Sequence, residues 1–293
     1  MLPHVRTAAD LVTSHAAVRD GFLSQALAKT EKATPYVENA QLLWTALQKV
    51  ERVETLLDLP QFRDDLITAA GFSEKARGHL NKEELDEAVK RVFDTLFAQA
   101  GAAFREEILY RYLLTKGDAL GGQMRNWTGA VGQQRLASAL LDALQPQEVE
   151  VVKARQSEKV QRISWSGRRL LFDVRPRLID KNIDVILLDV AGQDRTEAQL
   201  LADPERYLAC GELKGGIDPA GADEHWKTAA SALDRIRHVF PERCPSLFFV
   251  GAAIEASMAR EIFARLQDGR LHHAANLTDA DQLADLASWL VTL

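Results

Sequence analysis

The sequence predicts an α/β protein of the α+β type, with a central mixed sheet flanked by helices and a mainly helical N-terminal region. Two observations support this class. Up to about residue 145, apolar residues recur at spacings of three and four, as on one face of a helix. Beyond that point the apolar runs are short, rich in β-branched and aromatic residues, and separated by further helical patterns.

The helical spacing predicts four N-terminal helices, at residues 8–29, 36–59, 82–100 and 102–114. Ser73 and Asn81 each precede acidic residues, which is typical of a capped helix start. Glycines and a proline accumulate between Ala119 and Gln147, so the boundary between the two parts is expected there. We therefore assign residues 1–145 to a helical region and residues 146–293 to a second domain.

The second domain is predicted to hold the sheet. Six strands are expected, at residues 149–152, 162–165, 169–174, 183–190, 208–213 and 246–251. Helices are expected at residues 224–239, 258–267 and 279–290. Strands and helices in this order predict a mixed sheet with helices packed against it.

Composition excludes several classes of protein. With 46% hydrophobic and 27% charged residues in 293, the chain has the composition of a soluble protein with a substantial core. No apolar run is long enough for a bilayer and no signal segment opens the chain, so a cytoplasmic protein without membrane contact is expected. Two cysteines without ligand spacing indicate neither a disulfide framework nor a zinc site.

The charge distribution is more informative than the net charge of −6, which argues against coating nucleic acid by bulk electrostatics. Residues 153–181 carry nine basic side chains against three acidic ones. This stretch leads directly to Asp184. A solvated charged face is the alternative interpretation, because basic clusters on protein surfaces are common.

Two acids and a lysine follow apolar, strand-like runs. Asp184 lies 28 positions before Glu212 in the triplet Glu212-Leu213-Lys214. The strand period of two places Glu212 and Lys214 on one face. Asp184 and Glu212, with the backbone carbonyl of Leu213, are predicted to bind Mg²⁺, and Lys214 to orient a water or to stabilise charge on a phosphate. An ordinary solvated pair is the alternative.

Residues 211–229, together with Ile183-Asp184 and the Gly-Gly-x-Met-Arg-Asn run at residues 121–126, resemble type II restriction endonucleases of the AvaI/BsoBI kind. These enzymes belong to the PD-(D/E)XK nuclease superfamily. Asn182-Ile183-Asp184 stands here where the superfamily's name has Pro-Asp. The two glycines after Lys214 would allow a DNA strand to approach the backbone closely.

The resemblance implies a PD-(D/E)XK core and Mg²⁺-dependent hydrolysis of both strands of double-stranded DNA at a C/G-rich palindrome of the CYCGRG type. The products would carry 5′-phosphate and 3′-hydroxyl ends. It also implies a homodimer whose helical regions surround the duplex, and a cognate DNA methyltransferase elsewhere in the genome. Two other functions stay open: a sequence-tolerant or structure-specific repair nuclease of the superfamily, and a DNA-binding protein with an inactive nuclease fold.

By the same resemblance His225 lies near the cleavage centre, as a general base or a phosphate contact; a surface or capping role is the alternative. Trp226 and Ala229 are expected to anchor the same helix in the core. Asp218 could accept a hydrogen bond from cytosine N4, or could cap the turn before Pro219.

Further candidates for DNA binding are basic or amide side chains. Lys116, Arg125 and Asn126 flank the glycine pair and could hold a phosphate together with backbone amides, unless this stretch is a turn between two helices. Asn126 could instead read adenine or cap a helix starting near Trp127. Phosphate neutralisation is assigned to three arginines of the basic stretch, Arg162, Arg168 and Arg169.

Overall fold

The computed structural model describes residues 2–52, 55–56, 60–155, 159–192 and 195–293. Contacts along the chain divide it into two compact units. The sheet unit comprises Met1–Leu23 and Asn126–Leu293, and the helical unit comprises Ser24–Arg125. These limits differ from the division at residue 145, which concerned functional regions and stays a prediction.

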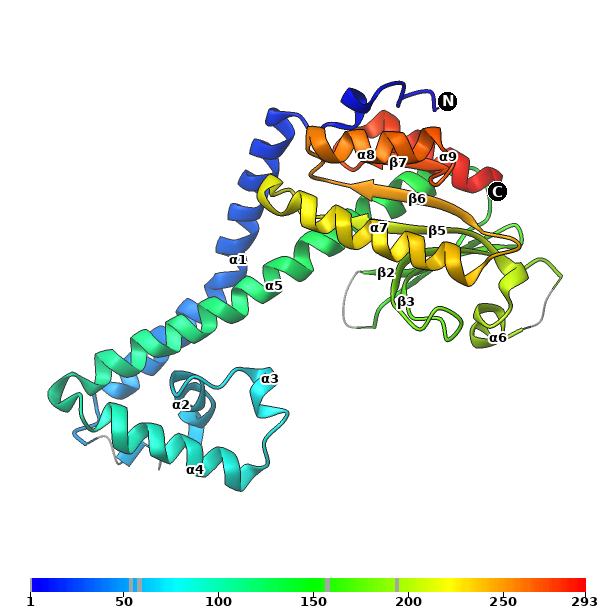
Figure 1. Ribbon diagram of the computed structural model, residues 1–293. Helices are drawn as coiled ribbons and strands as arrows, with labels where there is room; N and C mark the ends of the chain where they lie inside the picture. Colours follow the sequence, from blue (N-terminus) through cyan, green and yellow to red (C-terminus); the bar gives the residue numbers. More distant parts are fainter. Residues whose placement is uncertain (1, 53–54, 57–59, 156–158, 193–194) are drawn as a thin grey trace. The chain divides into compact units, whose positions relative to one another are not determined.

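The sheet unit is built on a mixed sheet. Within the described residues it has seven strands in sequential order: β1 (Glu150–Lys153), β2 (Val160–Trp165), β3 (Arg168–Val174), β4 (Ile183–Asp189), β5 (Tyr207–Lys214), β6 (Ser246–Gly251) and β7 (His273–Asn276). Strands β1 to β5 pair antiparallel, whereas β5, β6 and β7 are parallel. The six predicted strands and the α/β class are confirmed (Figure 1).

Helices cover both faces of this sheet. One face packs against α7 (Ala222–Val239) and α8 (Ala256–Gln267), and the other against α9 (Ala280–Thr292) and the C-terminal part of α5 (Phe104–Ala143). Strand β4 shows the alternation, since Ile186 and Leu188 belong to the first core and Val185 and Leu187 to the second. A short helix, α6 (Glu197–Leu201), precedes β5.

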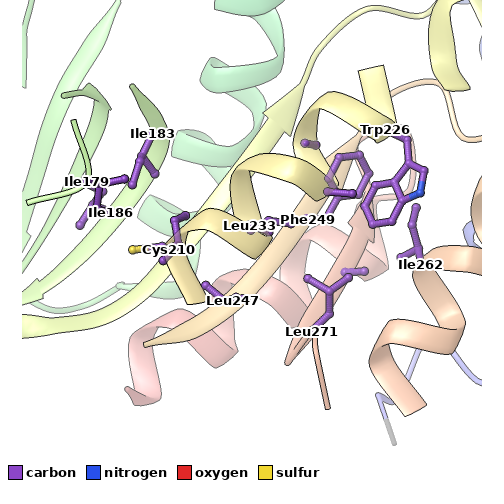
Figure 2. Packing of buried hydrophobic residues seen from close by; sticks show 14 of the residues in the cluster. Ile179, Ile183, Ile186, Cys210, Trp226, Leu233, Leu247, Phe249, Ile262 and Leu271 are labelled. Carbon is purple, nitrogen blue, oxygen red and sulfur yellow. The ribbon is translucent and has the colours of Figure 1, made fainter. Parts of the chain in front are cut away.

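The core under α7 and α8 is centred on aromatic packing. Trp226 of α7 is fully buried, and its ring centroid lies 5.0 Å from that of Phe249 on β6. Figure 2 shows Trp226 between Phe249 and Ile262 of α8, with Leu233 and Cys210 further along the same layer. The predicted anchoring of α7 by Trp226 and Ala229 is confirmed, because both are fully buried.

The first residues of the chain belong to the sheet unit. The 3-10 helix η1 (Ala8–Leu11) buries Leu11, and Asn276 Nδ2 on β7 donates to the Leu11 carbonyl at 2.9 Å. The Thr13 hydroxyl donates to the Ala252 carbonyl and accepts from the Ile254 N–H, both at 2.8 Å. The N-terminal segment is thereby fixed to the ends of β6 and β7.

Two long helices belong to both units. Helix α1 (His15–Leu47) runs through Pro35, and α5 runs through Gly121, Gly122 and Asn126 without a break. A helix start near Trp127 is therefore wrong. The boundary between the two regions in the glycine-rich stretch from Ala119 to Gln147 stays a prediction. A glycine lowers helix propensity by only about 1 kcal/mol, which the packing of the rest of the helix can outweigh.

The helical unit also contains α2 (Arg63–Ala69), α3 (Glu74–Arg77), α4 (Lys82–Val92) and the π-helical turn η4 (Phe93–Phe97). Ser73 and Asn81 accept hydrogen bonds from backbone N–H groups and cap α3 and α4 as predicted. The predicted helix at residues 36–59 ends at Leu47; its residues 53–54 and 57–59 lie outside the described ranges. No helix of the described residues combines the length and apolar character needed to cross a bilayer.

Candidate active site

The site lies where the pairing of β4 with β5 ends. The last antiparallel pair joins Val185 to Gly211. Beyond it, the Leu213 N–H donates to Asp184 Oδ2 at 2.8 Å. A carboxylate thus takes the place of the strand partner at this end of β5.

Lys214 connects the two carboxylates. Its Nζ lies 2.8 Å from Asp184 Oδ2 and 2.7 Å from Glu212 Oε2. The Glu212 side chain is 5% exposed, whereas those of Asp184 and Lys214 are each 22% exposed. The structure therefore brings these three predicted side chains together in a cluster with one enclosed carboxylate and one side open to solvent.

The environment shifts the pKa of two of these groups. Burial and the neighbouring Asp184 carboxylate raise the pKa of Glu212 to about 7, although the Lys214 ammonium acts in the opposite direction. Burial favours the neutral amine of Lys214, but Glu212 and Asp184 outweigh it, so the pKa of Lys214 is raised. One ammonium faces two carboxylates, and an additional cation would be attracted to this cluster.

The donor atoms suit a hard divalent cation. In an extended strand the N–H and C=O of one residue point to the same edge. Since the Leu213 N–H meets Asp184, the Leu213 carbonyl faces that edge too. No group of three or more His, Cys, Asp or Glu at ligand distances occurs among the described residues. Mg²⁺ needs no such group, because one or two carboxylates, waters and substrate phosphates hold it; its presence here stays a prediction.

The two glycines after Lys214 differ in their surroundings. A Cβ built on Gly215 would lie 2.3 Å from the Thr128 carbonyl oxygen of α5. A Cβ on Gly216 would meet no heavy atom within 4 Å. The close backbone approach predicted for DNA is therefore made at Gly215 by α5, and only Gly216 has open space beside it.

His225 lies on the surface of α7, in its first turn. It is exposed, and its Nε2 is 3.5 Å from the position of a Cβ built on Gly221. No hydrogen bond or ion pair within the described residues joins it to Asp184, Glu212 or Lys214. Its role in the cleavage reaction stays a prediction.

Asp218 caps a short helix. Its carboxylate accepts a hydrogen bond from the Ala220 N–H at 3.0 Å and begins the 3-10 turn η7 (Pro219–Gly221). The side chain is exposed. The capping alternative thus describes Asp218 in the free protein, and base reading stays a prediction.

The structure corrects one prediction for the residues beside Gly121 and Gly122. Lys116, Arg125 and Asn126 lie inside α5, where backbone amides bond to carbonyls of the same helix. A phosphate cradle of backbone amides at this place is therefore wrong, as is a turn between two helices. Lys116 Nζ lies 5.4 Å and 5.7 Å from the ring centroids of Tyr36 and Tyr112 in the helical unit. DNA contacts by these side chains themselves stay a prediction.

The arginines of the basic stretch lie on β2 and β3. Arg162 forms an ion pair with Glu150 at 3.0 Å, and Arg168 with Asp189 at 3.0 Å. Arg169 is half-buried, and its Nε is enclosed without a hydrogen-bond partner in the described part of the chain. Arg162 and Arg168 are already paired with acidic side chains, so each would have to leave its carboxylate partner in order to contact a phosphate.

Fold and site together define a class. An acid at the end of one central strand, an acid-x-Lys triplet on the next, and a mixed sheet with helices on both faces are the features of PD-(D/E)XK nucleases. A sequence model of the family described as restriction endonuclease BsobI matches residues 1–166 and 156–293. This chain belongs to that family of type II restriction endonucleases.

Curated relatives match along nearly the whole chain. The type II restriction enzyme AvaI of Nostoc sp. is 40% identical over 315 aligned residues, covering 99% of this chain and 98% of the relative. AvaI of Anabaena variabilis matches equally. The type II restriction enzyme BsoBI of Geobacillus stearothermophilus is 38% identical over 314 residues, covering 99% and 97%.

Proposed function

We propose that this protein is a site-specific deoxyribonuclease that requires Mg²⁺ and cuts both strands of DNA at a short C/G-rich palindrome of the CYCGRG type. It leaves 5′-phosphate and 3′-hydroxyl ends. The observation that carries the proposal is the contact of the Lys214 ammonium with Asp184 and Glu212, at the point where β4 and β5 stop pairing.

The chain's own groups have distinct parts in this reaction. Asp184 and Glu212, with the Leu213 carbonyl, would hold the cation. When bound, Mg²⁺ supplies Lewis-acid polarisation of the scissile phosphate. Lys214 keeps its proton, because two carboxylates face it, and donates hydrogen bonds to the attacking water or to a phosphate oxygen. His225, at the start of α7, acts as a general base or contacts a phosphate.

Recognition of the palindrome calls for two copies of the chain. A twofold homodimer presents the same surface to each half-site. In each copy Asp218 accepts a hydrogen bond from cytosine N4, and Arg162, Arg168, Arg169, Lys116 and Arg125 contact phosphates, with Asn126 beside them. A cognate DNA methyltransferase protects the host's own copies of the site.

The test is digestion of a long, sequenced, unmethylated DNA by purified protein with Mg²⁺. Parallel reactions contain EDTA, the Glu212→Ala variant, and Glu242→Ala as a matched control, because Glu242 is an exposed acid in the turn before β6. Discrete fragments from the wild type and the control, absent with EDTA and with Glu212→Ala, are expected. Sequencing the fragment ends gives the site and the end chemistry.

Three outcomes contradict the proposal. A continuous smear of products would identify a sequence-tolerant nuclease with the same metal site. Intact DNA that is nevertheless retained in a band-shift assay would identify a DNA-binding protein without cleavage. Cleavage that persists in Glu212→Ala would show that the Asp184–Glu212–Lys214 cluster is not the catalytic centre.

A further inference from the structure

The end of β5 is supported from behind by two long helices. Glu212 and Lys214 project from one face of β5, so Leu213 projects from the opposite face. That opposite face belongs to the core shared with α5. Residues 213–217, which link the catalytic strand to the turn at Asp218, contact α5 and also α1, all within the sheet unit.

The contact with α5 depends on a missing side chain at Gly132. A Cβ built there would lie 2.9 Å from Gly215 Cα and 3.1 Å from Leu213 Cδ2. Gly215 in turn faces the Thr128 carbonyl and lies close to Gly129 Cα, so the two backbones meet directly. Such an approach permits a Cα–H to point at the carbonyl oxygen.

Gly129, the neighbouring glycine of α5, provides a contrast. A Cβ on Gly129 would meet no heavy atom within 4 Å. Glycine inside a helix is destabilising relative to alanine. At Gly132 the close contact with Gly215 and Leu213 explains the glycine, whereas at Gly129 the space beside the helix would accept a methyl group.

The contact with α1 has the same form. A Cβ on Gly21 would lie 2.5 Å from Ile217 Cγ1 and 3.0 Å from Ile217 Cβ. Ile217 is 5% exposed, so its side chain has little room to move away. Helix α1 therefore fixes the segment just before Asp218, as α5 fixes it just after Lys214.

We propose that Gly21 and Gly132 are positioning residues of the active site. Strand β6 holds one edge of β5 at this end, through the hydrogen bond from the Ala252 N–H to the Lys214 carbonyl at 2.9 Å. Along the other edge, no strand of the described residues pairs with β5 beyond Gly211, and Asp184 accepts the Leu213 N–H there instead. Contact with α5 and α1 fixes the position of residues 213–217 relative to β4. It thereby also fixes the direction of the Leu213 carbonyl and of the Lys214 ammonium. This inference rests on the proposed function of that cluster.

The test compares Gly132→Ala with Gly129→Ala, two alanines one helical turn apart on α5. For Gly132→Ala we expect kcat for DNA cleavage to fall about 100-fold, because a displacement near 1 Å has that effect, with KM within about twofold. The affinity of the DNA-free protein for Mn²⁺, measured by isothermal titration calorimetry, should fall about tenfold, as expected when a contact that supports a metal ligand is lost. Gly129→Ala should match the wild type in both measurements.

If Gly132→Ala does not fold, a second pair of variants tests the same positioning role. Gly21→Ala should lower kcat and Mn²⁺ affinity in the same way, and adding Ile217→Ala should restore part of both, because it removes the Cγ atoms that the new methyl group meets. A purely structural contact would change the melting temperature without changing kcat or Mn²⁺ affinity.

Three results would overturn the positioning role: equal behaviour of Gly132→Ala and Gly129→Ala, a melting-temperature change alone, or no recovery in the double variant. Absence of cleavage by the wild type would overturn the proposed function only. The Mn²⁺ titration of the same variants then decides the positioning role by itself.

Discussion

Replacing Lys214 by methionine should destabilise the metal-free protein and make its stability depend on a divalent cation. The Lys214 ammonium contacts both carboxylates, at 2.8 Å and 2.7 Å, and methionine keeps most of its length without its charge. Glu212 would then share a buried site with Asp184 without compensation. Removing one partner of a buried ion pair leaves an uncompensated charge, which costs about 3–5 kcal/mol.

The lower end of that range applies here, because Asp184 and Lys214 are each 22% exposed and solvent screens part of the repulsion. About 3 kcal/mol corresponds to a fall in Tm of about 6–12 °C for a unit of this size. Added Mg²⁺ should reverse part of that fall, since a ligand that binds only the folded state stabilises it. Cleavage should be lost at all Mg²⁺ concentrations.

The assay is thermal unfolding of the wild type and Lys214→Met with EDTA and with Mg²⁺. Lys227→Met serves as the control, because Lys227 forms an exposed i,i+4 ion pair with Asp223 on α7. The control should unfold like the wild type in both buffers. Equal stability of Lys214→Met and Lys227→Met in EDTA would contradict this role of Lys214, as would a rise in Tm with Mg²⁺ no larger than that of the control.

Three further predictions concern the support of the sheet. Gly211→Ala should destabilise by about 1–3 kcal/mol or more in urea unfolding, because a Cβ there would lie 2.2 Å from the Phe248 ring. Asn276→Ala should lower the free energy of unfolding by about 2–3 kcal/mol and expose the segment before α1 to protease, because the buried Asn276 amide binds that segment. Unchanged digestion by protease would contradict this role of Asn276. The hydrogen bond from Arg265 holds the pKa of Asp234 below its usual value, so this carboxylate stabilises the fold above about pH 4 and the effect is lost as pH falls through the folded-state pKa. Asp234→Asn should therefore flatten the acid side of the stability curve, and an unchanged curve would refute this assignment.

Local pattern was sufficient to predict most of the sheet and the cluster at its centre. Strands β1 to β6 have apolar, β-branched or aromatic residues, and the period of two places Glu212 and Lys214 side by side. Strand β7 was missed, since His273-Ala274-Ala275-Asn276 has no β-branched residue and becomes a strand only by pairing with β6. Tertiary contact decides such a strand.

The glycines of α5 show the same limit of local sequence pattern. Gly121 and Gly122 indicate a break by propensity alone, yet the helix continues past them. The contact of Gly132 with Gly215 joins residues more than eighty positions apart, and no spacing rule in a single sequence connects them. Sequence predicted the cluster of Asp184, Glu212 and Lys214, whereas the contacts that support this cluster depend on packing between distant segments.

The attachment of the first residues to β7 has a consequence for the order of folding. Asn276 reaches Leu11 across 265 residues, and Gln282 reaches the Asp10 carbonyl across 272. Contacts of this separation carry a large loop-closure cost and form late. The helical unit, which is continuous in sequence, can acquire its fold during synthesis before the sheet unit is complete. The contacts of Asp10 and Leu11 with β7 and α9 thus form only after these two later elements have been synthesised.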